Sequence, residues 1–358
     1  MKNGSSRVGV VMAGGYGERF WPLSRPERPK QLLKLTHPKQ NMLEQAIGRL
    51  EPLVSEMYVS TSRLLGPAIE GSKILPADRL LCEPARRGTL GALCWTVAGL
   101  IALGRENATV AVVTADHSIG DVSGFRESVK AAFTVAEAAG GFVTLGIRPT
   151  RPETGYGYIE IDALKSIRLK SGATAYRSSA FLEKPNAEMA VDFMTSGRHL
   201  WNGGMFFFKV SEFMSELERA QPQAFEITNR VVAALKAGKP AEADRAFEEL
   251  PDESIDKAVM EKAETLHVIP VEFPWDDVGA WDALARTLES DQDGNVTLGP
   301  SHLLDVRSSV VVNDDPTRIV AVLGLEDVVV VNTHDAVLVC HKSEAQRVKQ
   351  LLAKVQGK

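Results

Sequence analysis

Two cations, Arg19 and Lys30, follow a glycine-rich loop closely enough to bind the same anion. The segment at residues 8–33 is VGVVMAGGYGERFWPLSRPERPKQLL, an apolar run followed by a loop that contains Ala13, Gly14, Gly15 and Gly17. Backbone N–H groups of such a loop can turn toward a phosphate without interference from a Cβ atom. Arg19 offers a forked donor to phosphate oxygens, and three prolines restrict the chain that presents Lys30. The segment therefore predicts a phosphate-binding site made of backbone donors and two fixed cations.

Two better-known glycine motifs do not match this loop. A P-loop needs GK[ST] after its glycines, and the dinucleotide fingerprint GxGxxG differs from GYGERF. The second predicted strand ends in Ser60 and Thr61, where a dinucleotide-binding fold would carry an acidic residue. Two interpretations stay open from these residues alone. The loop is a nucleotide site of a third kind, or a strand–helix turn flanked by ordinary surface cations.

Two aspartates, Asp116 and Asp277, are the candidates for holding a metal ion. Each follows an apolar or strand-like stretch beside small or turn residues. Mg²⁺ prefers one or two carboxylates completed by phosphate oxygens and water, so two carboxylates from distant segments suit it. The alternative is that both aspartates only cap loops. We expect Mg²⁺ as the cofactor.

The elements that must position these residues alternate between strand and helix. Apolar β-branched runs occupy residues 7–12, 56–61, 108–114 and 141–147. Helical patterns occupy residues 41–53, 87–104 and 124–140. This alternation predicts an α/β fold with a Rossmann-like mixed, mostly parallel sheet and flanking helices. Ligands of such sheets bind beyond the carboxyl ends of the strands, where the glycine loop and Asp116 both fall.

The C-terminal part changes character and predicts a small all-β unit. Its short apolar runs are spaced by nine residues, marked by Val310, Ile319, Val328 and Val337. Such spacing fits a meander, a fragment of a sandwich or a β-helix-like coil, and a last helix is expected at residues 343–355. We expect a catalytic domain at 1–290 and a small β domain at 296–358, divided near the polar ESDQDGN.

Composition limits the classes of partner. The 358 residues include 41 Lys and Arg against 46 Asp and Glu, a formal net charge of -5, which gives no bulk positive field for nucleic acid or an anionic membrane. The three cysteines show no CxxC spacing, which favours a reducing, cytoplasmic setting. No apolar stretch reaches the ~20 residues that span a bilayer. We expect small-molecule substrates, and a homodimer that uses the β unit as its surface.

The loop also resembles a known family signature. GGYGERFWPLSRPERPKQLL is similar to GG-x-G-x-R-(L/F)-x-P-L-(T/S)-x-x-x-P-K-(Q/P) of the sugar nucleotidyltransferases, and most similar to their mannose-1-phosphate guanylyltransferase branch. The resemblance continues in the family's order through LCEPARRGTLGAL, VTADHSI, RPETGYGYIEI, FLEKP, WNGGMFFFK and FPWDDVGAWDAL. It covers residues 8 to about 284, and the C-terminal segment resembles the small end domain of the same branch.

The resemblance implies an activity and a set of roles. The activity is Mg²⁺-dependent transfer of a guanylyl group from GTP to mannose 1-phosphate, giving GDP-mannose and pyrophosphate, with Arg19 and Lys30 as the catalytic cations. The expected nucleotide-binding residues are Ala13, Gly14, Gly15, Gly17, Glu83, Gly88, Thr89 and Asp116. The expected sugar-phosphate-binding residues are Gly155, Gly157, Glu183, Lys184 and Asn202. Asp116 and Asp277 are implied as the metal ligands.

One departure from the family pattern bears on the choice of base. Gly88 stands where asparagine is usual, so we expect GTP to be preferred, ATP to be used measurably, and Gly88→Asn to sharpen the preference. Two alternatives stay open: another NTP:hexose-1-phosphate nucleotidyltransferase, and a non-catalytic nucleotide-sugar-binding regulatory homologue. An NAD-linked oxidoreductase is disfavoured by the failed fingerprint. We expect one activity, without a fused isomerase.

Overall fold

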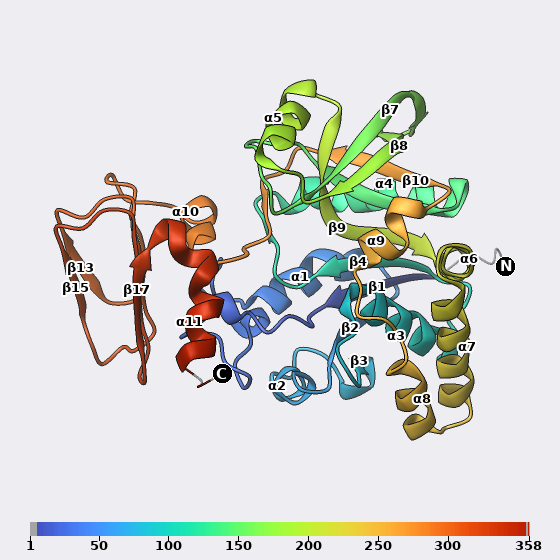
Figure 1. Ribbon diagram of the computed structural model, residues 1–358, viewed down its shortest axis with the longest axis horizontal. Helices are drawn as coiled ribbons and strands as arrows, with labels where there is room; N and C mark the ends of the chain where they lie inside the picture. The colour runs from blue at the N-terminus through green and yellow to red at the C-terminus, as the bar shows by residue number, and fades with distance from the viewer. Residues whose placement is uncertain (1–5, 356, 358) are drawn as a thin grey trace.

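A nine-stranded sheet forms the centre of the larger part of the molecule (Figure 1). The computed structural model describes residues 6–355 and 357, so residues 1–5, 356 and 358 of the two predicted domains lie outside the described residues. The strand order is β3-β2-β1-β4-β9-β6-β10-β8-β7. The bounds are β1 Arg7–Met12, β2 Glu56–Ser62, β3 Leu80–Glu83, β4 Thr109–Thr114, β6 Phe142–Ile147, β7 Gly157–Arg168, β8 Thr174–Glu183, β9 His199–Lys209 and β10 Leu266–Val271.

The sheet is mixed, as predicted. Strands β1 to β4, β6, β7 and β10 run in one direction, and β8 and β9 run in the other. Strand β9 enters antiparallel between β4 and β6 and thereby joins the half of the sheet formed by β1 to β4 to the half that carries the β7–β8 hairpin. The predicted fold class is confirmed.

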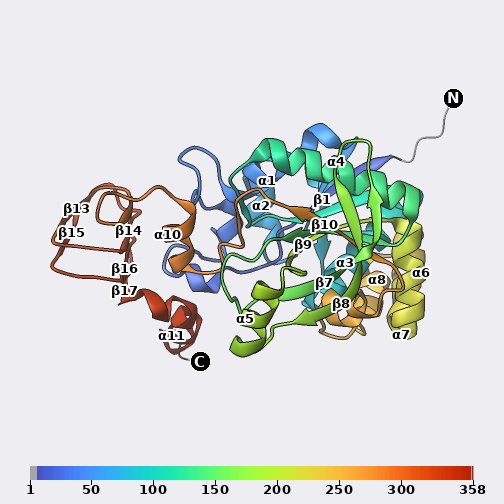
Figure 2. The ribbon, with the colours of Figure 1, turned by 90° about the horizontal axis from the view of Figure 1, so that it is seen from above.

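Helices cover both faces of the sheet (Figures 1 and 2). One buried cluster joins the sheet to α3 Gly88–Ala102, α6 Val210–Ala220, α7 Pro222–Lys236, α8 Pro240–Phe247 and α9 Ile255–Ala258. The other joins it to α1 Met42–Leu50, α2 Gly66–Gly71, α4 Val122–Ala139 and α5 Ala187–Ser196. A capping box starts α1, because Asn41 accepts from the Glu44 N–H at 2.8 Å and Glu44 accepts from the Asn41 N–H at 2.7 Å. None of the described helices is both long and apolar enough to cross a membrane.

The C-terminal strands form a coil beside the sheet (Figure 1). Its strands are β12 Val296–Leu298, β13 Ser301–Leu304, β14 Val310–Asn313, β15 Val320–Leu323, β16 Val328–Asn332 and β17 Val337–His341. Parallel pairing joins β12, β14 and β16 on one face and β13 and β15 on another, and β17 closes the coil antiparallel to β16. Val310 pairs with Val329, so one turn takes 19 residues and the nine-residue spacing marks alternate faces. Of the three architectures left open, the β-helix-like coil is confirmed.

The coil packs against the segment that carries the glycine loop. A shared buried cluster contains Phe20 and Leu33 from that segment, Trp281 from the connection, and Val310 and Val329 from the coil. Helix α11 Val348–Val355 lies against the short 3₁₀ turn Glu18–Phe20. The C-terminal part therefore reaches the residues that follow the glycine loop.

Candidate active site

A cavity of about 630 Å³ opens beyond the carboxyl ends of β1, β3 and β4. Its lining includes ten of the residues predicted from sequence: Gly14, Gly15, Gly17, Arg19, Lys30, Glu83, Gly88, Thr89, Asp116 and Asp277. Ala13 differs from the other predicted nucleotide-binding residues, because it is buried and its N–H donates to the Ser60 carbonyl at 2.7 Å. That N–H is used by the sheet and is not offered to a ligand.

Lys30 is held at the floor of this cavity by a close backbone approach. Gly17 has φ 65°, and a Cβ atom there would lie 2.4 Å from the Lys30 Cβ, so only glycine fits. The Lys30 Nζ lies 2.8 Å from Asp116 Oδ2 and 5.2 Å from the centre of the Phe20 ring. The ammonium therefore has a fixed place between a carboxylate and an aromatic face.

Gln31 steadies the glycine loop, a role that the sequence analysis missed. Its Nε2 donates to the Gly15 carbonyl at 2.7 Å, and the side chain is buried. Its Oε1 has no hydrogen-bond partner among the described residues. The Pro-Lys-Gln sequence at the end of the motif thus supplies both the lysine and the residue that fixes the loop facing it.

The two predicted metal ligands differ in their surroundings. Burial alone would raise the pKa of Asp116, but the Lys30 ammonium, together with smaller contributions from neighbouring groups, lowers it overall. Burial raises the pKa of Asp277, although its Oδ1 accepts a hydrogen bond from the Tyr156 hydroxyl at 2.8 Å. A Cβ at Gly279 would lie 2.9 Å from Asp277 Oδ2, so the glycine leaves room beside that oxygen. One carboxylate is ionised beside a cation, and the other has an uncrowded oxygen.

The neighbouring carboxylate, Asp276, has a structural role. It is buried, Arg286 Nε donates to its Oδ2 at 2.7 Å, and the Val278 N–H donates to its Oδ1 at 2.8 Å. These bonds fix the turn that presents Asp277 to the cavity. The motif WDDVG alone does not distinguish the two aspartates.

His117 lines the cavity as a neutral imidazole. Its Nδ1 accepts from the Trp275 indole N–H at 3.2 Å, and its carbonyl accepts from Arg49 at 3.1 Å. Burial lowers the pKa of His117 to about 4. At neutral pH the ring is uncharged and the Nδ1 lone pair is already engaged.

The wall formed by the start of α3 leaves no space for a side chain at position 88. Gly88 has φ 62°, and a Cβ atom there would lie 2.1 Å from the Glu253 carbonyl oxygen. The same oxygen accepts from the Leu90 N–H at 3.1 Å, and Thr89 Oγ1 accepts from the Ile255 N–H at 2.8 Å. The segment at 253–255 therefore packs on the start of α3. The expectation that Gly88→Asn would improve base selection is corrected, because the new side chain would displace this backbone.

Glu83 is a buried carboxyl group at the end of β3. Burial raises its pKa to about 7, and its Oε2 has no hydrogen-bond partner among the described residues. The group lines the cavity beside the glycine loop, with its Oε1 3.9 Å from where a Cβ at Gly14 would lie. A buried acceptor without a partner is costly, so this position favours a ligand that donates hydrogen bonds.

The predicted sugar-phosphate residues gather on β7, β8 and β9, beside this cavity and outside its lining. Lys184 has φ 53°, its N–H donates to the Tyr156 carbonyl at 3.2 Å, and its Nζ lies 3.4 Å from Glu183 Oε1. A Cβ at Gly157 would lie 2.6 Å from Glu183 Oε2, so a side chain there would push the carboxylate from this position. Gly155 lies in the exposed turn before β7, where its N–H donates to Glu153.

Asn202 is engaged by a partner that the sequence analysis missed. Its Nδ2 donates to Asp256 Oδ1 at 2.8 Å, and its Oδ1 accepts from the Gly204 N–H at 3.1 Å. Burial, and then the nearby Glu183, raise the pKa of Asp256 to about 6. Asp256 from α9 therefore joins the two predicted polar residues, Glu183 and Asn202, at this place.

Tyr156 connects the two groups of residues. Its hydroxyl donates to Asp277, which lines the cavity, and its carbonyl accepts from Lys184, one of the predicted sugar-phosphate residues. Lys349 of α11, also missed from sequence, adds a cation at the edge of the cavity, with its Nζ 3.0 Å from Glu18 Oε2.

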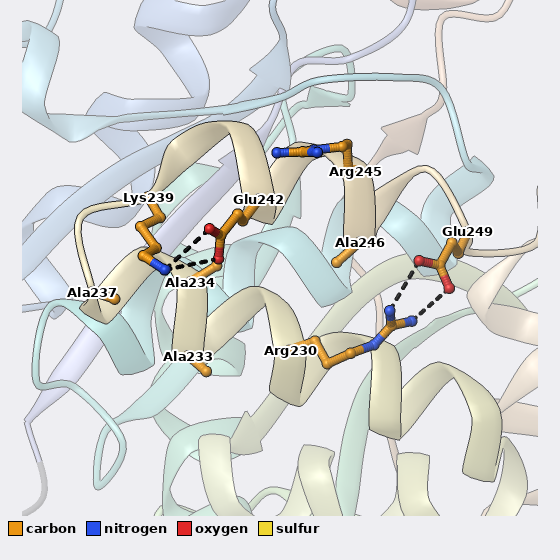
Figure 3. A pocket seen from close by; sticks show the side chains of 9 residues that line it. All are labelled: Arg230, Ala233, Ala234, Ala237, Lys239, Glu242, Arg245, Ala246 and Glu249. Carbon is orange, nitrogen blue, oxygen red and sulfur yellow. Dashed lines mark hydrogen bonds and ion pairs between the residues drawn. The ribbon is translucent and has the colours of Figure 1, made fainter.

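A separate hollow between α7 and α8 lacks the features of a reaction site (Figure 3). Its floor is made of alanines, and its cations are already engaged. The Arg230 Nη2 lies 2.6 Å from Glu249 Oε2, and the Lys239 Nζ lies 3.0 Å from Glu242 Oε1. The Nε of Arg245 donates to the Ala241 carbonyl. Two of these cations already have a carboxylate partner and the third donates to a carbonyl, so we take the cavity beyond β1, β3 and β4 as the candidate active site.

Comparison with known proteins assigns the family. The nucleotidyl transferase model matches residues 8–294, and the model of the MannoseP isomerase/GMP-like β-helix domain matches residues 302–355. This chain belongs to the nucleotidyl transferase family. The catalytic motifs of this nucleotidyl transferase thus fall within the first match, and its coil and α11 fall largely within the second.

Relatives of known name define the branch. This nucleotidyl transferase is 34% identical to a mannose-1-phosphate guanylyltransferase of Escherichia coli, over 97% of this chain and 75% of that protein. It is 35% identical to the alginate biosynthesis protein AlgA of Pseudomonas fluorescens, over 97% of this chain and 71% of that protein. A crystal structure named mannose-1-phosphate geranyltransferase, from Thermus thermophilus, is 36% identical with a TM-score of 0.87, covering 98% of this chain and 99% of that chain. The chain belongs to the mannose-1-phosphate guanylyltransferase branch of the family.

Proposed function

We propose that this nucleotidyl transferase moves a guanylyl group from GTP to mannose 1-phosphate, releasing pyrophosphate. The observation that carries the proposal is the buried Lys30 ammonium, paired with Asp116 at 2.8 Å at the floor of a cavity that Asp277 also lines. Tyr156 connects this floor to Lys184 and the sugar-phosphate residues. A cation, two carboxylates and a second cation thus line the path along which two phosphates would meet.

The reaction needs positioning and charge compensation more than proton transfer. An oxygen of mannose 1-phosphate attacks the α-phosphorus of GTP, the bond to the β-phosphate bridging oxygen breaks, and pyrophosphate leaves with that electron pair. The nucleophile is already anionic, so no protein base is required, in agreement with the neutral, engaged His117. Lys30 and Arg19 offset the charge on the α-phosphate and the leaving group, and Lys184 holds the second anion against the first.

The donor set suits Mg²⁺. Asp116 and Asp277 would hold the ion, since Asp116 is ionised beside Lys30 and Gly279 leaves space at Asp277 Oδ2. No group of three or more potential metal-ligating side chains occurs within residues 6–355 and 357, which fits an ion completed by phosphate oxygens and water. When bound, Mg²⁺ would supply charge neutralisation across the phosphates of GTP.

Base and sugar selection are assigned to two walls of the site. Glu83, buried and without a hydrogen-bond partner among the described residues, would accept from the N–H groups on the edge of guanine. On the other side, Glu183 and the Asn202–Asp256 pair would bind mannose hydroxyls. The backbone at Gly155 and Gly157 would approach the sugar ring.

A substrate screen tests the proposal directly. Pyrophosphate release is measured for GTP, ATP, UTP and dTTP, each with mannose 1-phosphate, glucose 1-phosphate or galactose 1-phosphate. We expect the highest kcat/KM for GTP with mannose 1-phosphate and measurable use of ATP. A higher value for another pair would overturn the proposed substrates, and no release with any pair would overturn the activity.

The homodimer, the cytoplasmic setting and the division into domains at 290–296 stay predictions. Several apolar side chains on the coil support a dimer because they are exposed: Leu304, Ile319, Leu323, Val337 and Val339. Sedimentation of the wild type against Leu323→Glu tests this, and a wild-type monomer at micromolar concentration would contradict it.

A further inference from the structure

A second cavity of about 630 Å³ lies behind the short strand pair β5 Ser118–Ile119 and β11 Trp275–Asp276. These strands are antiparallel, with Asp276 opposite Ser118. His117 and Asp277 line the nucleotide cavity, whereas their chain neighbours Ser118 and Asp276 line the second one. The strand pair is therefore the wall between two cavities, and the reaction proposed above uses only one of them.

The second cavity is rich in hydrogen-bond donors. Arg148, Arg151 and Arg286 all line it, although Arg151 already has Glu153 as a partner at 3.1 Å and Arg286 has Asp276 at 2.7 Å. Arg148 is loosely held, since its Nε lies 3.4 Å from Glu272 and its side chain is 59% exposed. The indole N–H of Trp201, a buried residue of the lining, has no acceptor among the described residues. A ligand that fits this set carries negative charge and several acceptor oxygens.

The walls add a shape requirement. Trp201 and Trp275 both contribute to the lining, and the Arg151 guanidinium lies 5.1 Å from the centre of the Trp201 ring. The volume lies within the range of small-molecule sites and exceeds what a lone phosphate needs. The Trp275 ring is partly exposed, whereas Trp201 is buried, and an aromatic ring with nearby donors suits a sugar ring that carries a phosphate. We propose that this cavity binds a small phosphorylated sugar and that its occupancy lowers turnover at the nucleotide cavity.

Two hydrogen-bonded paths cross the wall. Trp275, which lines the second cavity, donates from its Nε1 to His117 Nδ1 at 3.2 Å. Arg151 donates from Nη2 to the Tyr156 hydroxyl at 3.2 Å, and that hydroxyl donates to Asp277 Oδ1 at 2.8 Å. A phosphate that binds Arg151 would break the hydrogen bond from Arg151 to the Tyr156 hydroxyl. Because that hydroxyl donates to Asp277, the position of Asp277 in the reaction site would change as well. This regulatory half rests on the proposed function, whereas the binding half does not.

The binding half is tested by calorimetry, with no turnover involved. Mannose 6-phosphate is titrated into the protein without GTP or Mg²⁺. Inorganic phosphate and mannose are titrated separately, to measure binding of the phosphate group alone and of the sugar ring alone. We expect saturable binding of mannose 6-phosphate, weaker binding of phosphate, and none of mannose. Arg148→Ala should weaken binding by about tenfold, while Arg198→Ala, at an equally exposed arginine whose carboxylate partner is also 3.4 Å away, should not.

A second variant separates this cavity from the substrate site. Binding that persists in Lys184→Ala lies outside the mannose 1-phosphate site, as the proposal requires. Loss of binding in Lys184→Ala, equal binding in Arg148→Ala and the wild type, or no saturable binding by the wild type would each overturn the site.

The regulatory half is tested by initial rates of pyrophosphate release with saturating mannose 6-phosphate. We expect kcat/KM for GTP to fall about fivefold or more in the wild type, and to change little in Arg148→Ala at the same concentration. Arg151→Met should bind mannose 6-phosphate more weakly and should show no fall even when titrated to saturation. Unchanged turnover in a wild-type protein that calorimetry shows to be occupied would overturn the coupling, without touching the proposed reaction.

Discussion

The proposed nucleotide side of the site is built around a buried lysine paired with a half-buried aspartate, whereas the proposed sugar-phosphate side ends in an exposed lysine. The Lys30 side chain is 6% exposed with its Nζ 2.8 Å from Asp116, and the Lys184 side chain is 64% exposed with its Nζ 3.4 Å from Glu183. A buried charge must have a partner, while an exposed charge is satisfied by water. We therefore expect the Lys30 side of the site to be assembled before substrate arrives, and the Lys184 side to be completed by its substrate.

The backbone and side-chain restraints at Lys184 and Lys30 show the same contrast. Lys184 has a positive φ of 53°, which is uncommon for a residue with a side chain, and its N–H is fixed to the Tyr156 carbonyl. The main chain of the sugar side is thus held while its ammonium stays free. Lys30 is fixed at both ends, by the Gly17 contact and by Asp116. Mutations should therefore affect turnover on one side and substrate binding on the other.

Lys30→Ala should give the largest effect, because it removes a cation that the reaction needs and leaves Asp116 without its partner. We expect kcat to fall on the order of a hundredfold or more. Lys30→Arg should rescue poorly, since the space between Gly17 and Phe20 suits a narrow ammonium and the fork of a guanidinium is wider. Steady-state rates and circular dichroism check this, and near-normal turnover in a folded Lys30→Ala protein would contradict the role.

Asp277→Asn and Asp276→Asn, at adjacent positions, should change different properties: the first the Mg²⁺ requirement, and the second the free energy of unfolding. Asp277→Asn should raise the Mg²⁺ concentration needed for half-maximal rate by about tenfold or more, because an amide lacks the charge that Mg²⁺ prefers. Asp276→Asn should instead lower the free energy of unfolding by roughly 1–3 kcal/mol, through loss of the charge-assisted bond from Arg286. Mg²⁺ titrations and urea unfolding separate the two, and an unchanged Mg²⁺ requirement in Asp277→Asn would place the ion elsewhere.

Most elements of the first half of the sheet were predictable from sequence, and one strand further along the chain was not. Local periodicity was enough to predict β1, α1, β2, α3, β4, α4 and β6, since each element carries its own apolar pattern. Strand β10 was missed because Pro270 interrupts its pattern, and the sheet accepts that proline beyond the two residues at which β10 pairs with β8. The glycine loop and Lys30 form one continuous motif, so their proximity was predictable.

The missed residues are those whose roles depend on distant partners. Asp256 reaches Asn202 from α9, and Lys349 reaches the cavity from α11. The crowding of Gly88 by Glu253 also joins segments far apart in sequence, so the sequence alone did not show that packing requires a glycine there. A motif predicts which residues meet a ligand, while only the fold shows which of them are already engaged.

Glu83→Gln should make the protein more stable at high pH and should lower its selectivity for guanine. Burial raises the pKa of Glu83 to about 7 from an ordinary value of 4.5. The folded state thus holds a proton that the unfolded chain releases, and this contribution to stability is present below pH 4.5 and is lost as the pH rises to 7. We expect Glu83→Gln to raise the free energy of unfolding by roughly 2–3 kcal/mol at pH 8 and by little at pH 5. Equal differences in urea unfolding at both pH values would show that Glu83 does not titrate in this range.

Lys184→Ala should affect substrate binding without affecting stability. We expect KM for mannose 1-phosphate to rise about tenfold, with KM for GTP and the free energy of unfolding nearly unchanged, because the side chain is exposed. Lys165→Ala is the matched control, a lysine with 65% of its side chain exposed and a carboxylate partner at 3.2 Å. If Lys184→Ala lowered kcat as Lys30→Ala does, the contrast between the two sides would be lost.

Lys349→Ala should give the smallest effect, and it tests whether the C-terminal helix belongs to the nucleotide side. Its exposed Nζ lies at the cavity edge, 3.0 Å from Glu18, so we expect KM for GTP to rise only about two- to fivefold. The increase should shrink in ~0.5 M salt, because exposed charges are screened. Glu18→Gln should lower KM for GTP, since it removes a negative charge beside the phosphates and frees Lys349 to bind them. Lys354→Ala, on the same helix but lining a different hollow, is the control; equal changes in KM for the two lysine variants would mean that α11 acts only through the overall charge of the molecule.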